Sequence, residues 1–345
     1  MLVHGLSSTP GASFGKWDLG HTPESRGSTA WFGVNSDHRV RELFMRAVRI
    51  DRFGEPSVLR VDEVPEPEPE DGEVLIRAIA TSINPVDDKT REGAIGEGTP
   101  PLPMTLGWDL AGVVLDGGTS DFRAGERVIA MSHQLSTGRG TWADIVALRA
   151  SSVAPAPVSV SLVEAATLPL AGLSALQTLR WLAVSAGERL LIAGAAGAVG
   201  GLALQLARAR GVRVDALVSR EAQLDITRNH GAEFATTDPA ALADRHYDAV
   251  FDTFGAFVTD AVVEGGRYAS IATQAGPVPD LSARNVRTTV NQVREDGAGL
   301  REVVKHVDQG SVSVRVDSTF GIHDVRAAHR QFAAGGLNGK VTVTF

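Results

Sequence analysis

The sequence predicts an α/β protein in two parts, one made of short strands and one made of a parallel sheet flanked by helices. Its 345 residues exceed the size at which a single hydrophobic core usually stops growing. From residue 45 to about residue 160, short apolar segments are separated by Gly and Pro, which is typical of a small barrel or sandwich. Beyond residue 161, longer helical runs alternate with short apolar segments, which is typical of βαβ units.

The domain boundaries follow from the same changes in texture. After about residue 305 the pattern returns to strand, helix and strand, so we expect this segment to rejoin the first part. The expected division is residues 45–165 with 306–345 in one domain and residues 166–305 in the other. Residues 1–44 are rich in Gly, Ser, Thr and His and lack apolar periodicity, so we expect a disordered extension there.

In the first part, alternating apolar residues between turn signals predict short strands, at residues 47–50, 58–61, 74–80, 113–115 and 127–130. The segment from Pro65 to Glu70 alternates Pro with Glu and cannot enter a central strand, because Pro has no N–H to donate. We expect it to be an extended surface connector.

In the second part, residues 162–182 predict two helical stretches that separate near Pro169 and Gly172. Short apolar runs predict strands at residues 189–193, 213–218, 249–252 and 268–272. The final segment predicts a strand, a helix and a strand, at residues 312–320, 323–334 and 340–345.

Composition excludes several classes of function. The chain has no Cys, so disulfides, thiol nucleophiles and cysteine-ligated zinc are excluded. The formal net charge of −8 disfavours a general nucleic-acid surface, and no apolar stretch is long enough to cross a bilayer. The start of the sequence lacks a basic segment followed by an apolar core. We therefore expect a cytoplasmic protein that acts on a small molecule.

A Gly-rich turn between a strand and a helix is the strongest local signal, from residue 190 to residue 210. In a dinucleotide-binding loop, small residues make the tight turn, let the backbone approach the pyrophosphate and let the helix pack on the strand. Ala195, Gly197 and Gly200 hold these three places in order. Backbone N–H groups at the helix start, among them those of Ala198 and Val199, are expected to face the phosphates.

Further motifs extend this pattern over nearly everything from Met45 to Phe345: SINPVDDK at 82–89, GWDLAGVV at 107–114, AATLPLAGLSA at 165–175, GGR at 265–267 and GKV at 339–341. In these motifs the sequence resembles the medium-chain dehydrogenase/reductase superfamily. Within it, the zinc-free quinone oxidoreductase and enoyl reductase branch, which includes zeta-crystallin, is the most similar. The resemblance implies a GroES-like β-barrel catalytic domain and a Rossmann domain with a doubly wound parallel sheet that binds NADP(H). Nicotinamide and substrate would then lie in the cleft between the domains.

Departures from the zinc-dependent pattern decide the expected chemistry. The places of the family's zinc ligands are held by Asn84 and by Trp108 with Asp109, and neither Asn nor Trp is a useful zinc ligand. Without a Lewis acid, hydride addition to an alkene polarised by a carbonyl, or to a quinone, is easier than oxidation of a simple alcohol. We therefore expect a site without metal.

The catalytic candidates come from the first domain. The resemblance places Asn84 beside the nicotinamide, although Asn84-Pro85 could instead only start a turn. Asp87 and Lys89 are candidates for a polar pair or proton relay, or alternatively for a surface salt bridge. Trp108 and Trp142 are expected to wall the substrate pocket, with core packing as the alternative for Trp142. His133 lies on a loop near the expected cleft and is not among the catalytic candidates.

The cofactor candidates continue into the second domain. Ser174 is expected to lie along the cofactor, with helix capping as the alternative. About twenty residues beyond the glycine loop, where NAD enzymes usually carry a carboxylate, the sequence reads Ser219-Arg220-Glu221. Arg220 and Ser219 can bind a 2′-phosphate, which favours NADPH. Glu221 is the competing feature, because its carboxylate would favour NADH.

The expected function is NADPH-dependent hydride transfer to an enone, an enoyl thioester or a quinone. The alternative is a crystallin-like protein that binds NADPH without catalysis. We expect neither nucleic acid nor a membrane as a partner. The resemblance implies a homodimer that pairs through an edge strand at residues 288–293.

Overall fold

The computed structural model describes residues 43–272 and 275–345, which belong to one compact unit. The expected extension 1–44 therefore lies outside the described residues except for its last two. Phe44 already begins the first strand, one residue before the expected start of the folded chain.

The strands are β1 (Phe44–Ile50), β2 (Arg60–Pro65), β3 (Glu73–Ser82), β4 (Met104–Thr105), β5 (Asp109–Asp116), β6 (Arg127–Met131), β7 (Ile145–Arg149), β8 (Val153–Pro155), β9 (Arg189–Ala193), β10 (Arg213–Leu217), β11 (Phe234–Thr236), β12 (Tyr247–Asp252), β13 (Val262–Ser270), β14 (Arg287–Val290), β15 (Val316–Gly321) and β16 (Lys340–Thr344). The helices are α1 (Pro85–Glu92), α2 (Gln134–Thr137), α3 (Leu162–Ala165), α4 (Pro169–Leu182), α5 (Ala198–Ala209), α6 (Leu224–Asn229), α7 (Gly297–Asp308) and α8 (Val325–Ala334).

A six-stranded parallel sheet forms the second part, in the order β11-β10-β9-β12-β13-β14. Counted from β9, this order is 3-2-1-4-5-6, the arrangement of a Rossmann sheet. The strand order reverses between β9 and β12. Ligands of such sheets bind in the crevice outside the carboxyl ends of the strands at this reversal.

Both faces of this sheet are covered, because successive residues of a strand point to opposite sides. In β9, Leu190 and Ile192 belong to a core that includes residues of α4, α5 and α7. Leu191 and Ala193 belong to a separate core on the other face, which includes Leu242. The strand β9 is therefore buried on both faces. This burial explains why its apolar residues are consecutive and do not alternate with polar ones.

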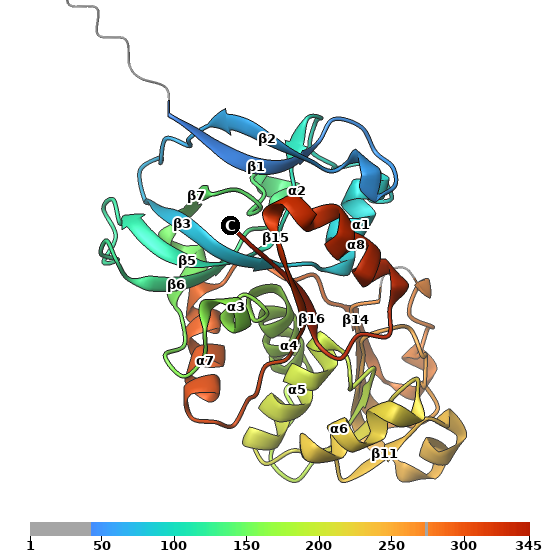
Figure 1. Cartoon of the computed structure of the whole chain (residues 1–345). Helices are drawn as coiled ribbons and strands as arrows, with labels where there is room; N and C mark the ends of the chain where they lie inside the picture. Colours follow the sequence, from blue (N-terminus) through green and yellow to red (C-terminus); the bar gives the residue numbers. More distant parts are fainter. Residues whose placement is uncertain (1–42, 273–274) are drawn as a thin grey trace, which may run out of the picture. The chain divides into compact units, whose positions relative to one another are not determined.

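The first part is built from a mainly antiparallel seven-stranded sheet, in the order β15-β16-β3-β5-β6-β8 with β7 beside β3, and a smaller sheet in the order β2-β1-β4. β16 pairs with β3, so the final segment of the chain adds a strand to the sheet of the first part. Figure 1 shows α8 and β16, in red, beside the blue and cyan elements that come early in the chain.

Several expected elements differ from the structure, among them the following three. Residues 58–61 are not one strand, because Val58 ends a short 3-10 helix and β2 begins only at Arg60. The strand expected at 312–320 begins at Val316. Gly172 lies inside α4, which starts at Pro169, and does not separate two helices. Pro is favoured at the first helical position, so Pro169 alone marks this boundary.

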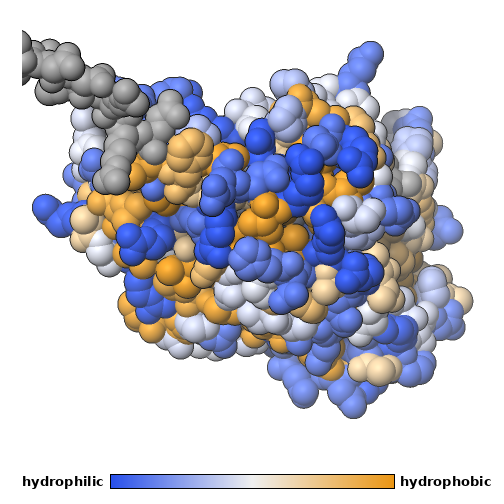
Figure 2. Space-filling model, turned by 45° about the horizontal axis from the view of Figure 1, so that its top comes forward, coloured by the Kyte–Doolittle hydropathy of each residue, from blue (hydrophilic) through white to orange (hydrophobic). Residues whose placement is uncertain are grey.

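The surface mixes polar and apolar side chains. Figure 2 shows hydrophilic and hydrophobic residues interspersed over the visible face. No helix within the described residues is long and apolar enough to span a bilayer.

Candidate active site

A cavity of about 750 Å³ opens at the carboxyl ends of β9 and β12, where Gly194 and Thr253 follow these strands. Its lining joins the two parts of the protein, since residues of α1 and β16 and residues of α4 and α5 all contribute to it. Lys89, Arg315 and Lys340 are among the lining side chains, and none of the described residues that line it is Asp or Glu. The cavity therefore suits an anionic molecule, although the whole chain carries a net charge of −8.

The glycine loop forms one wall of this cavity. Gly194 has a φ of 82°, and a Cβ atom there would collide with the side chain of Thr253. Gly200 packs so closely on the backbone of Gly194 and Ala195 that a side chain would not fit. Gly197 precedes α5 and lines the cavity, so backbone can approach a bound molecule there. The loop has the close contacts that a dinucleotide-binding turn requires.

One assignment within this loop needs correction. The tight turn with positive φ lies at Gly194, one residue before Ala195, to which the sequence pattern assigns it. Ala195 is fully buried in the core and does not line the cavity. A left-handed conformation favours Gly over Ala, which explains why the turn lies at the glycine.

The first turn of α5 is open toward the cavity. No side chain caps the helix, its first turn has no acidic residue, and Ala198 and Val199 line the cavity. N–H groups in the first turn of a helix have no partner within the helix, and the helix dipole is positive at this end. The residues present therefore fit a cofactor with phosphate groups.

Asn84, which lines the cavity, is held in a buried network. Its side-chain N–H group donates to Asp109 at 2.9 Å, and its Oδ1 accepts from the Lys340 ammonium group at 2.5 Å. The same ammonium group donates to Asp109 at 2.7 Å, and Ser82 Oγ donates to this carboxylate as well. The other oxygen of Asp109 accepts from the backbone of Leu170 at 2.7 Å, at the start of α4. The network thus ties three separate segments of the chain to one carboxylate.

Asp87 does not reach the cavity. It is fully buried, and Oδ2 accepts from the backbone N–H of Asn84 at 2.8 Å, so the carboxyl group closes the first turn of α1. Burial raises the pKa of Asp87 to about 8, against the lowering effect of the hydrogen bond from Asn84. This corrects the expected proton relay, since Lys89 lines the cavity and Asp87 does not. Burial lowers the pKa of the Lys89 ammonium group.

The two tryptophans have different places. Trp108 lines the cavity, and its ring meets the His133 ring edge to face with 4.7 Å between ring centroids. Trp142 lies in a core cluster of the first part, where its ring is 5.2 Å from that of His329. Trp142 therefore has the core-packing role that was the alternative, and the expected pocket wall at this residue is wrong.

The cofactor candidates of the second part also differ in whether they line the cavity. Ser174 lines the cavity from within α4, far from its N-cap at Leu168, so capping does not explain it. Ser219 lines the cavity, and its hydroxyl group donates to Gln223 at 3.1 Å. Arg220 is exposed outside the lining and approaches Gly336 of the first part.

Glu221, the feature that would favour NADH, accepts a hydrogen bond from Thr237 Oγ1 at 2.8 Å. Its carboxylate is not part of the cavity lining.

Sequence reasoning did not identify Lys340 and Arg315 as site residues. The Arg315 guanidinium group donates to the Ala196 carbonyl of the glycine loop at 2.7 Å and to Asn338 at 2.8 Å. Burial lowers the pKa of the Arg315 guanidinium group. For Lys340, the GKV motif was a signal of resemblance, but the motif does not show which residues the side chain contacts.

The donor set does not resemble a metal site. Within residues 43–272 and 275–345, no group of three or more His, Cys, Asp or Glu side chains could hold a metal ion. The position between Asn84 Oδ1 and Asp109 Oδ2 is held by the Lys340 ammonium group.

Comparison with known proteins extends these observations. Residues 70–158 match the family model described as alcohol dehydrogenase GroES-like domain, and residues 189–343 match the one described as zinc-binding dehydrogenase. The chain is 30% identical to the 2-methylene-furan-3-one reductase of Solanum lycopersicum, over 87% of this chain and 79% of that protein. It is 29% identical to the chloroplastic NADPH-dependent alkenal/one oxidoreductase of Arabidopsis thaliana, over 92% of this chain and 84% of that protein.

Among solved structures, the quinone oxidoreductase of Coxiella burnetii superposes with a TM-score of 0.78 at 27% identity, over 88% of this chain and all of that one. Both parts of the fold, the order of the motifs and these relatives agree with the predicted resemblance. The chain belongs to the medium-chain dehydrogenase/reductase superfamily, with a GroES-like domain and a Rossmann-type domain that meet at the cavity.

Proposed function

We propose that this protein is an NADPH-dependent oxidoreductase that transfers hydride, without a metal ion, to a conjugated carbonyl compound or a quinone. The observation that carries the proposal is the cavity itself. A glycine loop, the open start of α5 and three cationic side chains line it, and no lining residue among those described is acidic. Bound NADPH would supply the hydride, and its phosphate groups need such a cationic surface.

The end of β10 supports NADPH over NADH. Ser219 and the exposed Arg220 follow β10, and Rossmann domains usually hold the ribose 2′ position after this strand. An arginine fork suits a phosphate, while the competing carboxylate of Glu221 is bonded to Thr237. Arg315 adds a charge beside the loop that would face the pyrophosphate common to both cofactors.

The remaining lining supports a flat, apolar hydride acceptor with one polar end. Its apolar side chains include Ile83, Val86, Ile95, Trp108, Leu135, Leu170, Phe332 and Leu337. Lys340 uses two N–H donors on Asn84 and Asp109, which leaves one for an oxygen atom of a bound molecule. A fixed ammonium group can thus provide positive charge where zinc enzymes use a metal.

The test is NADPH consumption with a panel of acyclic and cyclic enones, enoyl thioesters and quinones, together with NADPH binding measured by nucleotide fluorescence. We expect turnover with at least one class and a preference for NADPH over NADH. Tight NADPH binding without turnover of any compound would instead support the crystallin-like alternative.

We further propose that two copies pair through β14. This strand is an edge of the six-stranded sheet, and Val290 in it is 40% exposed. An edge strand has backbone groups that can bond to a second copy. Light scattering at micromolar concentration should give the mass of a dimer, and a monomer mass would refute this.

A further inference from the structure

Reduction of an enone needs a proton as well as a hydride. This inference rests on the proposed function. When the hydride bonds to the β-carbon, the electron pair of the C=C bond moves toward the carbonyl group and gives an enolate. A proton must then bond to the α-carbon before a saturated ketone can leave. Protonation at carbon is slow without a positioned acid, so a side chain that lines the cavity is the natural source.

Neither tyrosine can supply this proton. The chain has two tyrosines, and both hydroxyl groups are buried donors to carboxylates in the six-stranded sheet. Tyr247 donates to Asp215 at 2.8 Å and Tyr268 donates to Asp252 at 2.6 Å. Burial raises the pKa of both hydroxyl groups, and neither residue lines the cavity.

The cationic side chains of the cavity are not equal candidates. A guanidinium group does not release its proton, which excludes Arg315 as an acid. The Lys340 ammonium group is bonded to Asn84 and Asp109, so proton loss would break that buried network. Lys89 and His133 are the remaining ionisable groups of the described lining.

His133 is held in place from three sides. Its backbone N–H donates to Glu295 of the segment between β14 and α7 at 2.7 Å, and its ring packs edge to face on Trp108. Its Nδ1 lies 2.8 Å from Ser136 Oγ, which also lies 3.0 Å from the His133 carbonyl oxygen.

These contacts suit a protonated ring. If the Ser136 hydroxyl group donates to the carbonyl oxygen of His133, Ser136 Oγ can accept the Nδ1–H of that imidazolium. The second ring proton, on Nε2, is then the one available for transfer. Imidazole is the side chain most often used for such transfers, and a ring fixed by neighbours needs little reorganisation.

We propose that His133 is the proton donor of this site, and that it determines the face on which the α-carbon of an enone is protonated. The Nε2–H bond of the imidazolium breaks, the α-carbon–H bond forms with the electron pair of the enolate, and the neutral imidazole regains a proton from water. The hydride and this proton together complete the reduction of one C=C bond. Reduction of a quinone should depend less on His133, because the reduced quinone is protonated on oxygen. Water protonates oxygen rapidly.

The test compares His133→Gln with the wild type on four measurements. For an α-methyl enone such as 2-methyl-2-cyclohexenone or 3-methyl-3-penten-2-one, we expect kcat to fall at least about 100-fold, the range for loss of a general acid. For menadione we expect a fall of less than about threefold. In residual enone turnover the product should lose its excess of one α-configuration, measured by chiral gas chromatography. NADPH affinity should stay within about twofold.

Three further variants separate chemistry from folding. His133→Phe keeps a ring against Trp108 and should reproduce the loss. His323→Gln changes an exposed histidine away from the cavity and should behave as the wild type. Lys89→Met tests the rival donor. Loss of α-selectivity in Lys89→Met with full selectivity in both His133 variants would overturn the assignment.

The two proposals fail in different ways. A wild type that reduces no enone would overturn the enone part of the proposed function. A wild type that reduces enones, with His133 variants of unchanged rate and unchanged α-selectivity, would overturn only the role of His133.

Discussion

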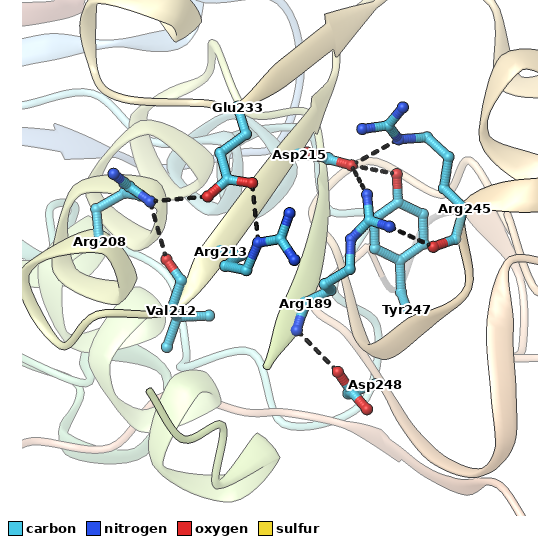
Figure 3. Close-up of polar contacts among 9 residues, drawn as sticks. All are labelled: Arg189, Arg208, Val212, Arg213, Asp215, Glu233, Arg245, Tyr247 and Asp248. Atoms are coloured by element: carbon cyan, nitrogen blue, oxygen red, sulfur yellow. Dashed lines mark hydrogen bonds and ion pairs between the residues drawn. The ribbon is translucent and has the colours of Figure 1, made fainter. Parts of the chain in front are cut away.

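The hydroxyl group of Tyr247 on β12 donates to the carboxylate of Asp215 on β10, across the intervening strand β9. Arg189 and Arg245 donate to the same carboxylate at 2.9 and 2.8 Å, as Figure 3 shows. Arg189 is the first residue of β9, whereas the glycine loop follows its last residue. The cluster therefore lies at the end of the sheet opposite the cavity. The Asp215 carboxylate accepts hydrogen bonds within this cluster and has a structural role, not the role of binding a ribose hydroxyl group.

Asp215→Asn should lower the free energy of unfolding by about 1.5–3 kcal/mol, because charge-assisted hydrogen bonds to a buried carboxylate are lost. NADPH affinity should not change. Urea denaturation and a fluorescence titration measure the two effects. The matched control is Glu233→Gln, whose exposed pairs with Arg208 and Arg213 should contribute less than about 1 kcal/mol. Weaker NADPH binding with unchanged stability would place Asp215 in the cofactor site.

Arg220→Ala should weaken NADPH binding by about 1.5–3 kcal/mol and leave NADH binding nearly unchanged, since only NADPH has a 2′-phosphate. Titration with each nucleotide gives both numbers. Arg228→Ala, an exposed arginine on α6 paired with Asp225, should bind both cofactors as the wild type does. Equal losses of affinity for NADPH and NADH would show that Arg220 does not bind the 2′-phosphate.

Arg315→Met should weaken NADPH and NADH alike, by about 10- to 100-fold, because the pyrophosphate is common to both. The same titrations measure it, and higher salt should reduce the difference from the wild type. Arg301→Met on α7, which is exposed and outside the cavity lining, is the control. A change of less than twofold for both cofactors in Arg315→Met would remove Arg315 from the binding site.

Asp87→Asn should remove a pH dependence of stability. Burial raises the pKa of the folded carboxyl group to about 8, far above its value in an unfolded chain, so unfolding releases a proton. Rising pH therefore lowers the free energy of unfolding of the wild type between about pH 4 and 8, by on the order of 2–5 kcal/mol.

The amide can still accept from the backbone N–H of Asn84, as Asp87 Oδ2 does. Urea denaturation at pH 5 and pH 8 should show a smaller difference for Asp87→Asn than for the wild type. Equal differences in the two proteins would mean that Asp87 is ionised in the folded state without penalty.

Exhaustive chelation should leave enone or quinone turnover unchanged, because the Lys340 ammonium group holds the position between Asn84 and Asp109. Metal analysis of the purified protein before and after chelation checks this. Zinc in a one-to-one ratio, lost together with activity, would contradict a mechanism without metal.

Sequence patterns predicted those structural features that depend on residues close together in the chain. The apolar run from Leu190 to Ala193 predicts a strand, and the following glycines predict a turn and a helix start, because both signals lie within a few residues. The one-residue error at Ala195 arose because a spacing pattern does not show which residue has positive φ.

Contacts between distant segments could not be predicted in the same way. Trp142 and Trp108 are both buried aromatic residues, and only the packed structure shows that Trp108 lines the cavity whereas Trp142 lies outside the lining. Asp87 lies two residues from Lys89 on α1, yet the helix turns one inward and the other to the cavity. The case for His133 rests on its contacts with Ser136, Glu295 and Trp108, which the sequence does not reveal.

The bond between Lys340 and Asn84 spans 256 residues of sequence. A ribosome adds about 5–20 residues per second, so Lys340 is added to the chain roughly 13–50 seconds after Asn84. Through that interval β3 lacks β16 beside it, while the whole Rossmann-type domain is made and can fold. The edge of β3 at Thr81 and Ser82, which β16 later covers, is thus open to other chains just when the nascent protein is crowded.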